Sequence, residues 1–404
     1  MNNKNELLAA IQRLDAWVEK NGWSGWDPYD IRGAYLPRKI ERLPANLLTK
    51  IVKKLVLALL DIHPLYARRL FGIRPEINAK GMGLFLASYC NLFNATKNQN
   101  YLHKASQCAE WLIDNRNENF QGWGWGYPFD WYSPIYIPKG IPSSIASATI
   151  GDGFYKLYGC TGNDKYLQIC KKICDFFMNG LKITYKEGDA ICFSYTPLDN
   201  YQVHNTNLII GEFLTRVGKE TGDKHLTEMG FYCGNFALKE QQPEGFLPYW
   251  GLSQTDLYSN GKLHTDHYHS GFEIRMVYGI WKNTSDVRFR DAYVKYFDWY
   301  LKNLFDGGII PKFTPKSKYP INIHSCAEAI LCRATLLPDH PEQAAQLENT
   351  VEWTLKNMEY KDGEYTYLIK RFPVLGERKI NIPMIRWGQA WMFRALSELY
   401  LKCI

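Results

Sequence analysis

Apolar residues recur at helical spacing along most of the chain, in pairs of segments separated by a short polar turn. In segment 78–115, a helix rich in Gly, Ala and Leu precedes the turn ATKNQNYL and a second, amphipathic helix. Segments 142–180 and 204–238 repeat this order, with the turns CTGNDKYL and ETGDKHL. Gly, Asn and Asp end the first helix of each pair, and the next aromatic residue or Leu begins the following apolar stripe. The pattern predicts a series of helical hairpins.

Two further hairpins follow in segments 269–304 and 322–358, so that five hairpins repeat about every 60 residues. The first helical segment, 6–20, has the pattern of a second helix without a partner, and the last, 385–401, has that of a first helix. Pairing the two chain ends gives six inner and six outer helices and leaves no exposed end. The sequence therefore predicts an all-α fold, an (α/α)6 toroid formed by one domain over residues 1–404.

The lengths of the connections indicate which end of the ring carries the function. Turns from inner to outer helices span about five residues, whereas connections from outer to inner helices span about 15 to 30 and contain many aromatic residues and glycines. Alternating patterns such as FLPYW and EYTYLI predict short β-hairpins there. The same mouth collects the N-termini of the inner helices, whose free N–H groups favour anions or hydroxyl groups.

Composition and charge narrow the class of protein. With 46% apolar and 22% charged residues, the chain is typical of a globular protein. Its start lacks the features of a secretion signal, and the run IVKKLVLALLDI (51–62) is too short and too charged to span a bilayer, which predicts a buried or interfacial helix. The ten cysteines form no CxxC pair and predict buried, reduced thiols in a cytoplasmic protein. The net charge of +7 is mild, and the Lys and Arg residues are spread along the chain instead of forming a stripe, so no nucleic-acid partner is expected.

The stretch HTDHYHSGFEIRMVY (264–278) concentrates chemistry-bearing residues at the predicted mouth. His269 and Glu273 are four residues apart on one helix face, where a carboxylate can orient an imidazole as a general base. His324 and Glu328 repeat this spacing in the next hairpin, and His204 opens another inner helix. Helix capping and ion pairing are the alternative roles for these residues.

The candidate chemistry leaves three classes of function open. Two bases of matched pKa are what an epimerase needs, so His204, His269, Glu273, His324 and Glu328 are the catalytic candidates. A glycoside hydrolase instead uses two carboxylates, which Asp130, Asp199, Asp266, Glu273 and Glu328 offer. A glycan-binding protein without activity is the third class. Although His264, Asp266, His267 and His269 offer metal ligands, their spacing matches no standard zinc motif, so neither a metal nor a cofactor is expected.

Residues of the mouth loops predict a sugar or oligosaccharide ligand. Aromatic rings stack on sugar faces, and their polar edges reach water. The aromatic candidates are Trp123, Trp125, Trp131, Tyr195, Tyr249, Trp250, Tyr258 and Tyr268. The polar substrate-binding candidates are Asp130, Asp199, Asn205, Asp266 and His267. Arg371, Arg378 and Arg386 either hold a carboxylate or phosphate of an anionic sugar or form surface ion pairs.

Three segments carry a resemblance to known families. DNYQVHNTNLIIGEFLTRVGKETGD (199–223) is similar to a sugar 2-epimerase segment in which a helix opens with His and a Glu precedes a TGD turn; His204 and Glu212 match, at a different spacing. HSGFE (269–273) resembles the Gly-His-x-x-Glu-Trp helix of that family, with the pair four apart instead of three. IPSSIASATIGDGF (141–154) is similar to the Pro-Ser-Ser and Gly-Phe elements of glucuronyl C5-epimerases.

The chain thus resembles the six-hairpin carbohydrate-active toroid proteins, which include N-acylglucosamine 2-epimerase-like enzymes, glucuronyl C5-epimerases and several glycosidases. This resemblance covers nearly the whole chain as architecture. It implies a sugar or uronic acid epimerase of bacterial surface-polysaccharide metabolism, such as exopolysaccharide biosynthesis, acting by His/Glu acid–base chemistry. The alternatives within the same fold are a glycoside hydrolase and a polysaccharide lyase.

Overall fold

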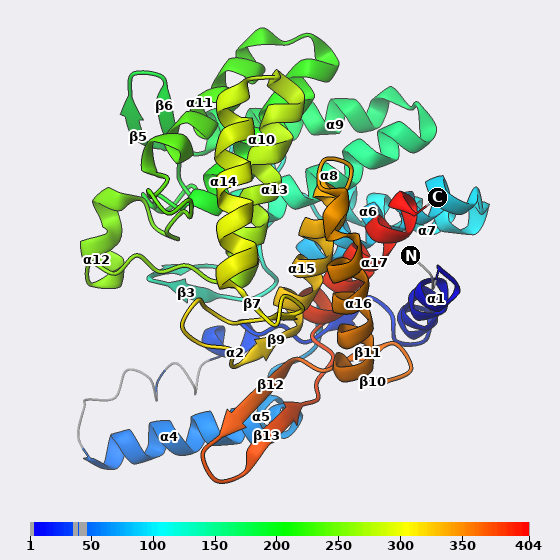
Figure 1. Ribbon diagram of the computed structural model, residues 1–404, viewed down its shortest axis with the longest axis vertical. Coiled ribbons are helices and arrows are strands. Elements are labelled where there is room, and N and C mark those ends of the chain that lie inside the picture. The colour runs from blue at the N-terminus through cyan, green and yellow to red at the C-terminus, as the bar shows by residue number, and fades with distance from the viewer. Residues whose placement is uncertain (1–3, 35–38, 40–46, 404) are drawn as a thin grey trace.

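A computed structural model describes residues 4–34, 39 and 47–403 of the chain. Its inner helices form a ring in which each helix contacts the next and the last closes against the first. They are α6 (Ala79–Thr96), α8 (Ser144–Thr161), α10 (His204–Thr221), α13 (His267–Thr284), α15 (Ile323–Leu336) and α17 (Trp391–Lys402), which follows the π-helical turn η4 (Ile385–Ala390). The prediction of an (α/α)6 toroid is confirmed (Figure 1).

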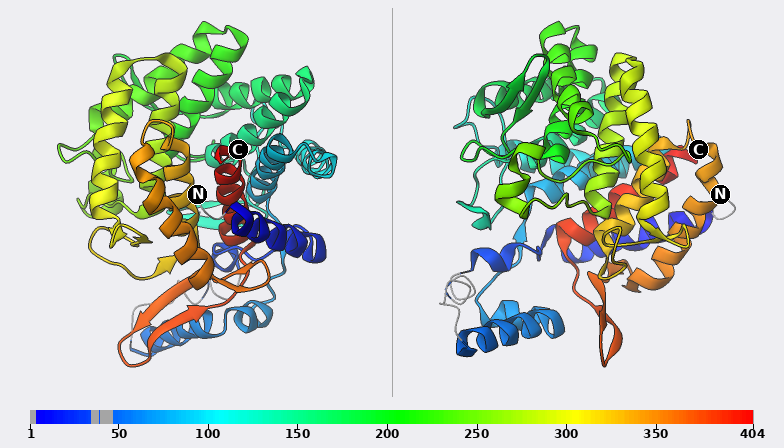
Figure 2. Two further views of the ribbon diagram at one scale, coloured as in Figure 1. Left: turned by 45° about the vertical axis from the view of Figure 1, so that its right-hand side comes forward. Right: turned by 60° about the vertical axis from the view of Figure 1, so that its left-hand side comes forward.

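Each inner helix is paired with an outer helix. The outer helices are α1 (Lys4–Asn21), α7 (Gln99–Asp114), α9 (Asp164–Asp175) with the π-helical turn η1 (Phe176–Gly180), α11 (Lys224–Glu240), α14 (Val287–Asn303) and α16 (Ala344–Met358). Helix α1 packs against α17, so the two ends of the chain lie close together (Figures 1 and 2). The hydrophobic core fills the space between the two layers, and all ten cysteines are free thiols, eight of them buried.

The short turn between the helices of a hairpin has the same construction in four of the repeats. A residue with left-handed backbone conformation ends the inner helix, and an Asn or Asp side chain then caps the outer helix. The left-handed residues are Lys97, Gly162, Gly222 and Ser285. The capping residues are Asn98, Asn163, Asp223 and Asp286. This explains why the turn motif recurs in the sequence.

Small residues on the inner helices let neighbouring backbones approach closely. Gly83 of α6 faces Ile150 of α8, and a Cβ placed on it would lie 2.8 Å from the Ile150 Cα atom. Gly159, further along α8, has open space around its Cβ position and an ordinary helical backbone. Close packing therefore requires a glycine at position 83, whereas position 159 can accept a larger side chain.

We expect Gly83→Ala to lower the free energy of unfolding by about 1–2 kcal/mol, because overpacking outweighs the gain of ~1 kcal/mol in helix propensity. Gly159→Ala serves as the control and should leave stability unchanged or raise it by up to ~1 kcal/mol. Urea unfolding of both variants measures the difference. Equal stability of the two variants would contradict the close approach of α6 and α8.

The connections from outer to inner helices form small antiparallel sheets and short helices. The strand pairs are β1 (Ser24–Gly25) with β2 (Glu76–Ile77), β3 (Trp131–Ser133) with β4 (Ile135–Ile137), β5 (Ile183–Glu187) with β6 (Ala190–Phe193), β7 (Phe305–Asp306) with β8 (Ile310–Pro311), and β10 (Glu359–Lys361) with β11 (Glu364–Tyr365). Strand β12 (Leu368–Phe372) pairs with both β9 (Ile321–Asn322) and β13 (Gly376–Ile380). The short helical segments of these connections are α2 (Asp30–Gly33), η2 (Leu252–Gln254) and α12 (Thr255–Ser259), whereas η3 (Pro341–Gln343) lies in the turn from α15 to α16.

The prediction of β-hairpins at this mouth is confirmed for EYTYLI, which supplies β11 and the start of β12. It is wrong for FLPYW, where Trp250 makes only an isolated bridge to Val203. Pro248 in the middle of this stretch has no N–H group to donate to a partner strand. The stretch therefore runs as a loop.

Helices α4 (Leu47–Ile62) and α5 (Pro64–Leu70) extend beyond the ring (Figures 1 and 2). The sequence predicts a buried or interfacial helix here, and the structure excludes the buried alternative because Leu48 and Leu55 are 74% and 64% exposed. In the described part of the chain, no helix combines the length and apolarity needed to cross a membrane.

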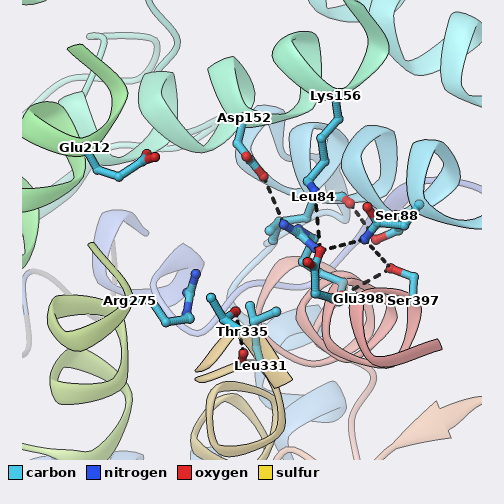
Figure 3. A network of polar contacts seen from close by, with 12 residues as sticks. Leu84, Ser88, Asp152, Lys156, Glu212, Arg275, Leu331, Thr335, Ser397 and Glu398 are labelled. Atoms are coloured by element: carbon cyan, nitrogen blue, oxygen red, sulfur yellow. Dashed lines mark hydrogen bonds and ion pairs between the residues drawn. The ribbon is translucent and has the colours of Figure 1, made fainter. Parts of the chain in front are cut away.

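At the end of the ring opposite the mouth, a network of charged side chains lines a cavity of about 260 Å³. Arg394 of α17 binds Asp152 of α8 at 3.1 Å and Glu398 at 2.5 Å. Arg216 of α10 binds the other oxygen of Asp152 at 2.7 Å, and Lys156 lies 3.4 Å from Glu398. Figure 3 shows Asp152 and Lys156 reaching from α8 toward Glu398 of α17. The ion pairs therefore tie neighbouring inner helices together at this end.

Candidate active site

A cavity of about 90 Å³ lies where the inner helices begin. Every inner helix, or the turn that leads into it, contributes at least one side chain to the wall. Eight of the candidates predicted as site residues line it: Trp131, Tyr195, Asn205, Tyr249, Tyr268, His269, His324 and Arg386. The other lining residues are Tyr29, Lys80, Tyr127, Ile145, Phe272 and Trp387. The wall is therefore mainly aromatic, with a few polar groups.

His269 is held in place by Asp266, the N-cap residue of α13. One Asp266 oxygen accepts a hydrogen bond from the His269 backbone N–H at 3.0 Å, and the other lies 2.7 Å from Nδ1 of the imidazole. Because an ionised carboxylate only accepts hydrogen bonds, Nδ1 carries the proton and Nε2 is the basic nitrogen. The ring lies against Tyr249 and Tyr268. The pair is built like the oriented base of an acid–base enzyme.

Glu273 is not the partner that the spacing of four residues predicts for His269. Its carboxylate is buried and accepts a hydrogen bond of 2.5 Å from the Tyr296 hydroxyl of outer helix α14. Burial raises the pKa of Glu273 well above its usual value, although the Tyr296 hydrogen bond opposes this shift. The side chain therefore lies behind the cavity wall, between two helices.

His324 lines the cavity as a neutral imidazole. Its ring is stacked between Tyr268 at 4.5 Å and Trp391 at 4.9 Å. Neither ring nitrogen has a hydrogen-bond partner within the described chain. Burial lowers its pKa well below the usual value, and the nearby Lys80 adds to this effect. Glu328, predicted as its partner, instead binds Arg275 of α13 at 2.6 and 2.9 Å.

We expect His324→Phe to raise the free energy of unfolding at neutral pH by about 1–3 kcal/mol, because a phenyl ring fits the stack and no unpaired nitrogen is buried. In the unfolded natural chain, the His324 imidazole binds a proton below a pKa of about 6.5, whereas in the folded chain it stays neutral. The unfolded state therefore binds more protons, and the free energy of unfolding falls as the pH drops. The variant should lose part of this acid sensitivity, with buried His267 retaining its own share. Urea unfolding at neutral and mildly acidic pH tests this prediction. His103→Phe, at an exposed position of α7, is the control. An acid sensitivity of His324→Phe equal to that of the natural chain would contradict the prediction.

Lys80 and Arg386 are the buried cationic side chains of the cavity. Lys80 lies over the Phe272 and Trp391 rings, and burial together with Arg386 lowers its pKa well below the usual value. Arg386 forms two hydrogen bonds of 2.6 and 2.8 Å with Asp27. Sequence reasoning missed Lys80, although a lone lysine in the first turn of a Gly-rich inner helix was a usable signal.

The Asp27–Arg386 pair separates this cavity from a larger one of about 400 Å³. Asp130, a substrate-binding candidate, lines the larger cavity and accepts hydrogen bonds from the Tyr136 hydroxyl and the Lys139 backbone N–H.

Several other candidates serve the packing around the cavity. The imidazole of His204 is buried and binds Glu240 at 2.8 Å, and His267 packs against Tyr300. The indole of Trp125 donates a hydrogen bond to the Leu112 carbonyl oxygen at 2.9 Å. None of these three side chains lines the smaller cavity.

The remaining candidates lie in loops. Asp199 accepts hydrogen bonds from the backbone N–H groups of Tyr195, Thr196 and Tyr201 and so shapes its own loop. Trp250 packs on Tyr201. Arg371 and Arg378 are exposed on the β12–β13 hairpin. The described residues contain no group of three or more His, Cys, Asp or Glu arranged to hold a metal ion.

No family model and no curated protein matches the sequence. Solved structures share the fold at low sequence identity. A cellobiose 2-epimerase from Bacillus thermoamylovorans superimposes with a TM-score of 0.60 at 13% identity, over 81% of this chain and 88% of that chain. An unsaturated glucuronyl hydrolase specific for heparin superimposes with a TM-score of 0.62 at 12% identity, over 98% of this chain and 96% of that chain. A GH76 α-mannanase from Bacteroides thetaiotaomicron superimposes with a TM-score of 0.60 at 11% identity, over 81% of this chain and 87% of that chain. The chain thus has the six-hairpin toroid fold of these enzymes.

Proposed function

We propose that the protein is an enzyme that isomerises a neutral sugar by acid–base chemistry in the smaller cavity. The observation that carries this proposal is the Asp266–His269 pair, whose basic nitrogen belongs to a residue lining an aromatic cavity. Aromatic walls suit a sugar face. The fold is shared with sugar epimerases, which supports a reaction of this class.

The geometry supports proton transfer better than hydrolysis. A glycosidase needs two carboxylates beside the scissile bond, and among the described residues that line the cavity there is no Asp or Glu. The nearby carboxylates are engaged elsewhere: Asp266 with His269, and Glu273 with Tyr296. A neutral sugar is favoured because Asp27 already neutralises Arg386 and because Lys80 is buried with a lowered pKa.

In the proposed reaction, Nε2 of His269 removes a proton from the carbon next to the carbonyl group of the open-chain sugar. The electron pair of the broken C–H bond forms a C=C bond, and the carbonyl oxygen takes the negative charge. Hydrogen bonds from Lys80 and an N–H group of His324 stabilise this oxygen. His269 returns the proton to the former carbonyl carbon while the proton of the neighbouring hydroxyl group moves to the charged oxygen, which gives the ketose or aldose isomer. For the epimer, water delivers a proton to the original carbon from the opposite face, the carbonyl group re-forms, and His269 releases the proton that it removed to solvent.

Solvent exchange tests the proposal directly. The protein is incubated in heavy water with neutral hexoses, N-acetylhexosamines and disaccharides, alongside uronic acids for comparison, and NMR follows deuterium at each carbon. Exchange next to the carbonyl carbon, lost in the His269→Ala variant, supports isomerisation. Release of reducing ends without exchange would replace the proposal by hydrolysis, and ligand binding without either signal would leave a glycan-binding protein.

A further inference from the structure

Helix α4 exposes an apolar face to solvent. Its exposed apolar residues are Leu48, Ile51, Val52, Leu55 and Ile62. At 100° per residue, the spacings of three, four, seven and fourteen place all five in one stripe along the helix. An outer helix of a toroid normally turns such a stripe toward the core. In α4, the stripe faces solvent.

A second apolar projection lies on the β12–β13 hairpin. Val374 and Leu375 in its turn are 93% and 54% exposed. Exposed basic residues flank this tip: Arg371 on β12, and Arg378 and Lys379 on β13. Helix α5, which follows α4, adds exposed Leu65, Tyr66 and Leu70. The hairpin and α4 extend beyond the same end of the ring in all views (Figures 1 and 2).

The excess of basic over acidic residues in the chain lies in two segments that contain α4, α5 and the β12–β13 hairpin. Residues 47–74 and 368–380 together contain ten Lys or Arg and two acidic residues. One of the ten, Arg68, is buried against Asp30. The rest leave a net charge of +7, which equals the net charge of the whole chain, so the remainder of the molecule is neutral overall.

We propose that α4 and the β12–β13 hairpin bind the surface of an anionic phospholipid membrane. Apolar side chains on an amphipathic helix enter the headgroup boundary, and flanking Lys and Arg bind anionic headgroups. A purely electrostatic partner such as nucleic acid would not use a continuous apolar stripe. The apolar residues between basic ones fit a bilayer interface.

This surface lies next to the mouth of the ring. Residues 71–74, which directly follow α5, line the larger cavity. Strand β12 pairs with β9, which leads into α15 and His324. A protein bound through α4 and the hairpin therefore has its mouth at the membrane surface.

Vesicle sedimentation tests the proposal with the full chain. We expect binding to vesicles of phosphatidylcholine containing phosphatidylglycerol, weak binding to pure phosphatidylcholine, and a strong decrease at high salt. Leu48→Ser with Leu55→Ser, and separately Arg378→Glu with Lys379→Glu, should each lower the partition coefficient roughly tenfold or more. Circular dichroism confirms that the variants remain folded.

Matched controls come from other faces of the molecule. Leu257→Ser on α12, whose leucine is 72% exposed, and Lys171→Glu with Lys224→Glu on the outer helices should leave binding unchanged. Equal binding to both kinds of vesicle, no binding at all, or equal losses in the control variants would overturn the proposal. So would sedimentation velocity showing that the apolar stripe forms a dimer of this chain while vesicles are not bound.

Discussion

Replacing His269 with alanine is expected to reduce turnover of the isomerised sugar by about 10²–10⁴-fold, the usual contribution of a positioned general base. The side chain contacts Asp266, Tyr249 and Tyr268 near the surface of the mouth and is 17% exposed, so its loss should leave the fold intact. Steady-state kinetics and the rate of deuterium exchange should fall together, because both depend on removal of the same proton.

Asp266→Asn tests the orientation of that base separately. An asparagine can still cap α13, but its amide no longer selects the proton position on the imidazole. We expect a loss of kcat with little change in KM and a shift in the pH profile of kcat. His225→Ala, on the exposed start of α11, is the matched control and should retain full activity. Full turnover by His269→Ala would remove the basis of the proposed reaction.

The fold could be predicted from the sequence because its determinants are local and repeated. Four of the short turns combine a left-handed residue with an Asx cap, as in Gly222 followed by Asp223, and so place a polar break between two apolar stripes. Closure of the ring could be predicted because the first helix of the chain has the pattern of a second hairpin helix and the last has that of a first hairpin helix, so the two complete one hairpin. The exposed stripe of α4 could not be predicted, because a stripe indicates an apolar partner without showing what covers it.

The site was predictable in position but not in its pairings. Residues four apart share a helix face, yet the second lies about 6 Å deeper along the axis. In α13 this depth separates His269 at the mouth from Glu273, which meets Tyr296 of the outer layer. In α15 it brings Glu328 to Arg275 of the neighbouring helix instead of His324. Spacing within one helix does not report which side chain an adjacent helix supplies.

The position of a histidine at the start of a helix also does not predict which carboxylate it contacts. His204 and His269 both stand in the first turn of an inner helix, and both have a carboxylate partner. The partner of His269 is three residues earlier in the chain, so the imidazole stays at the mouth. The partner of His204 is Glu240, at the end of outer helix α11, which holds the imidazole between the layers. The rotation of each helix about its own axis decides the outcome.

Arg394 joins two carboxylates of the charged network at the far end of the ring. Burial alone raises the pKa values of Asp152 and Glu398, but Arg394 with Arg216 and Lys156 outweighs this effect and lowers both. Both carboxylates therefore stabilise the fold above their ordinary pKa of about 4, and this contribution is lost as the pH falls toward the lower folded-state values.

Arg394→Met is expected to lower the free energy of unfolding at neutral pH by about 3 kcal/mol, because it leaves two carboxylates with fewer partners. The loss lies at the lower end of the range for broken buried pairs, since Arg216 still binds Asp152 and Lys156 still binds Glu398. The variant should also lose less stability on acidification than the natural chain. Arg290→Met removes an exposed pair with Asp291 and should change stability by less than about 1 kcal/mol. Urea unfolding that gave the two variants equal stability would show that the network does not hold the inner helices together.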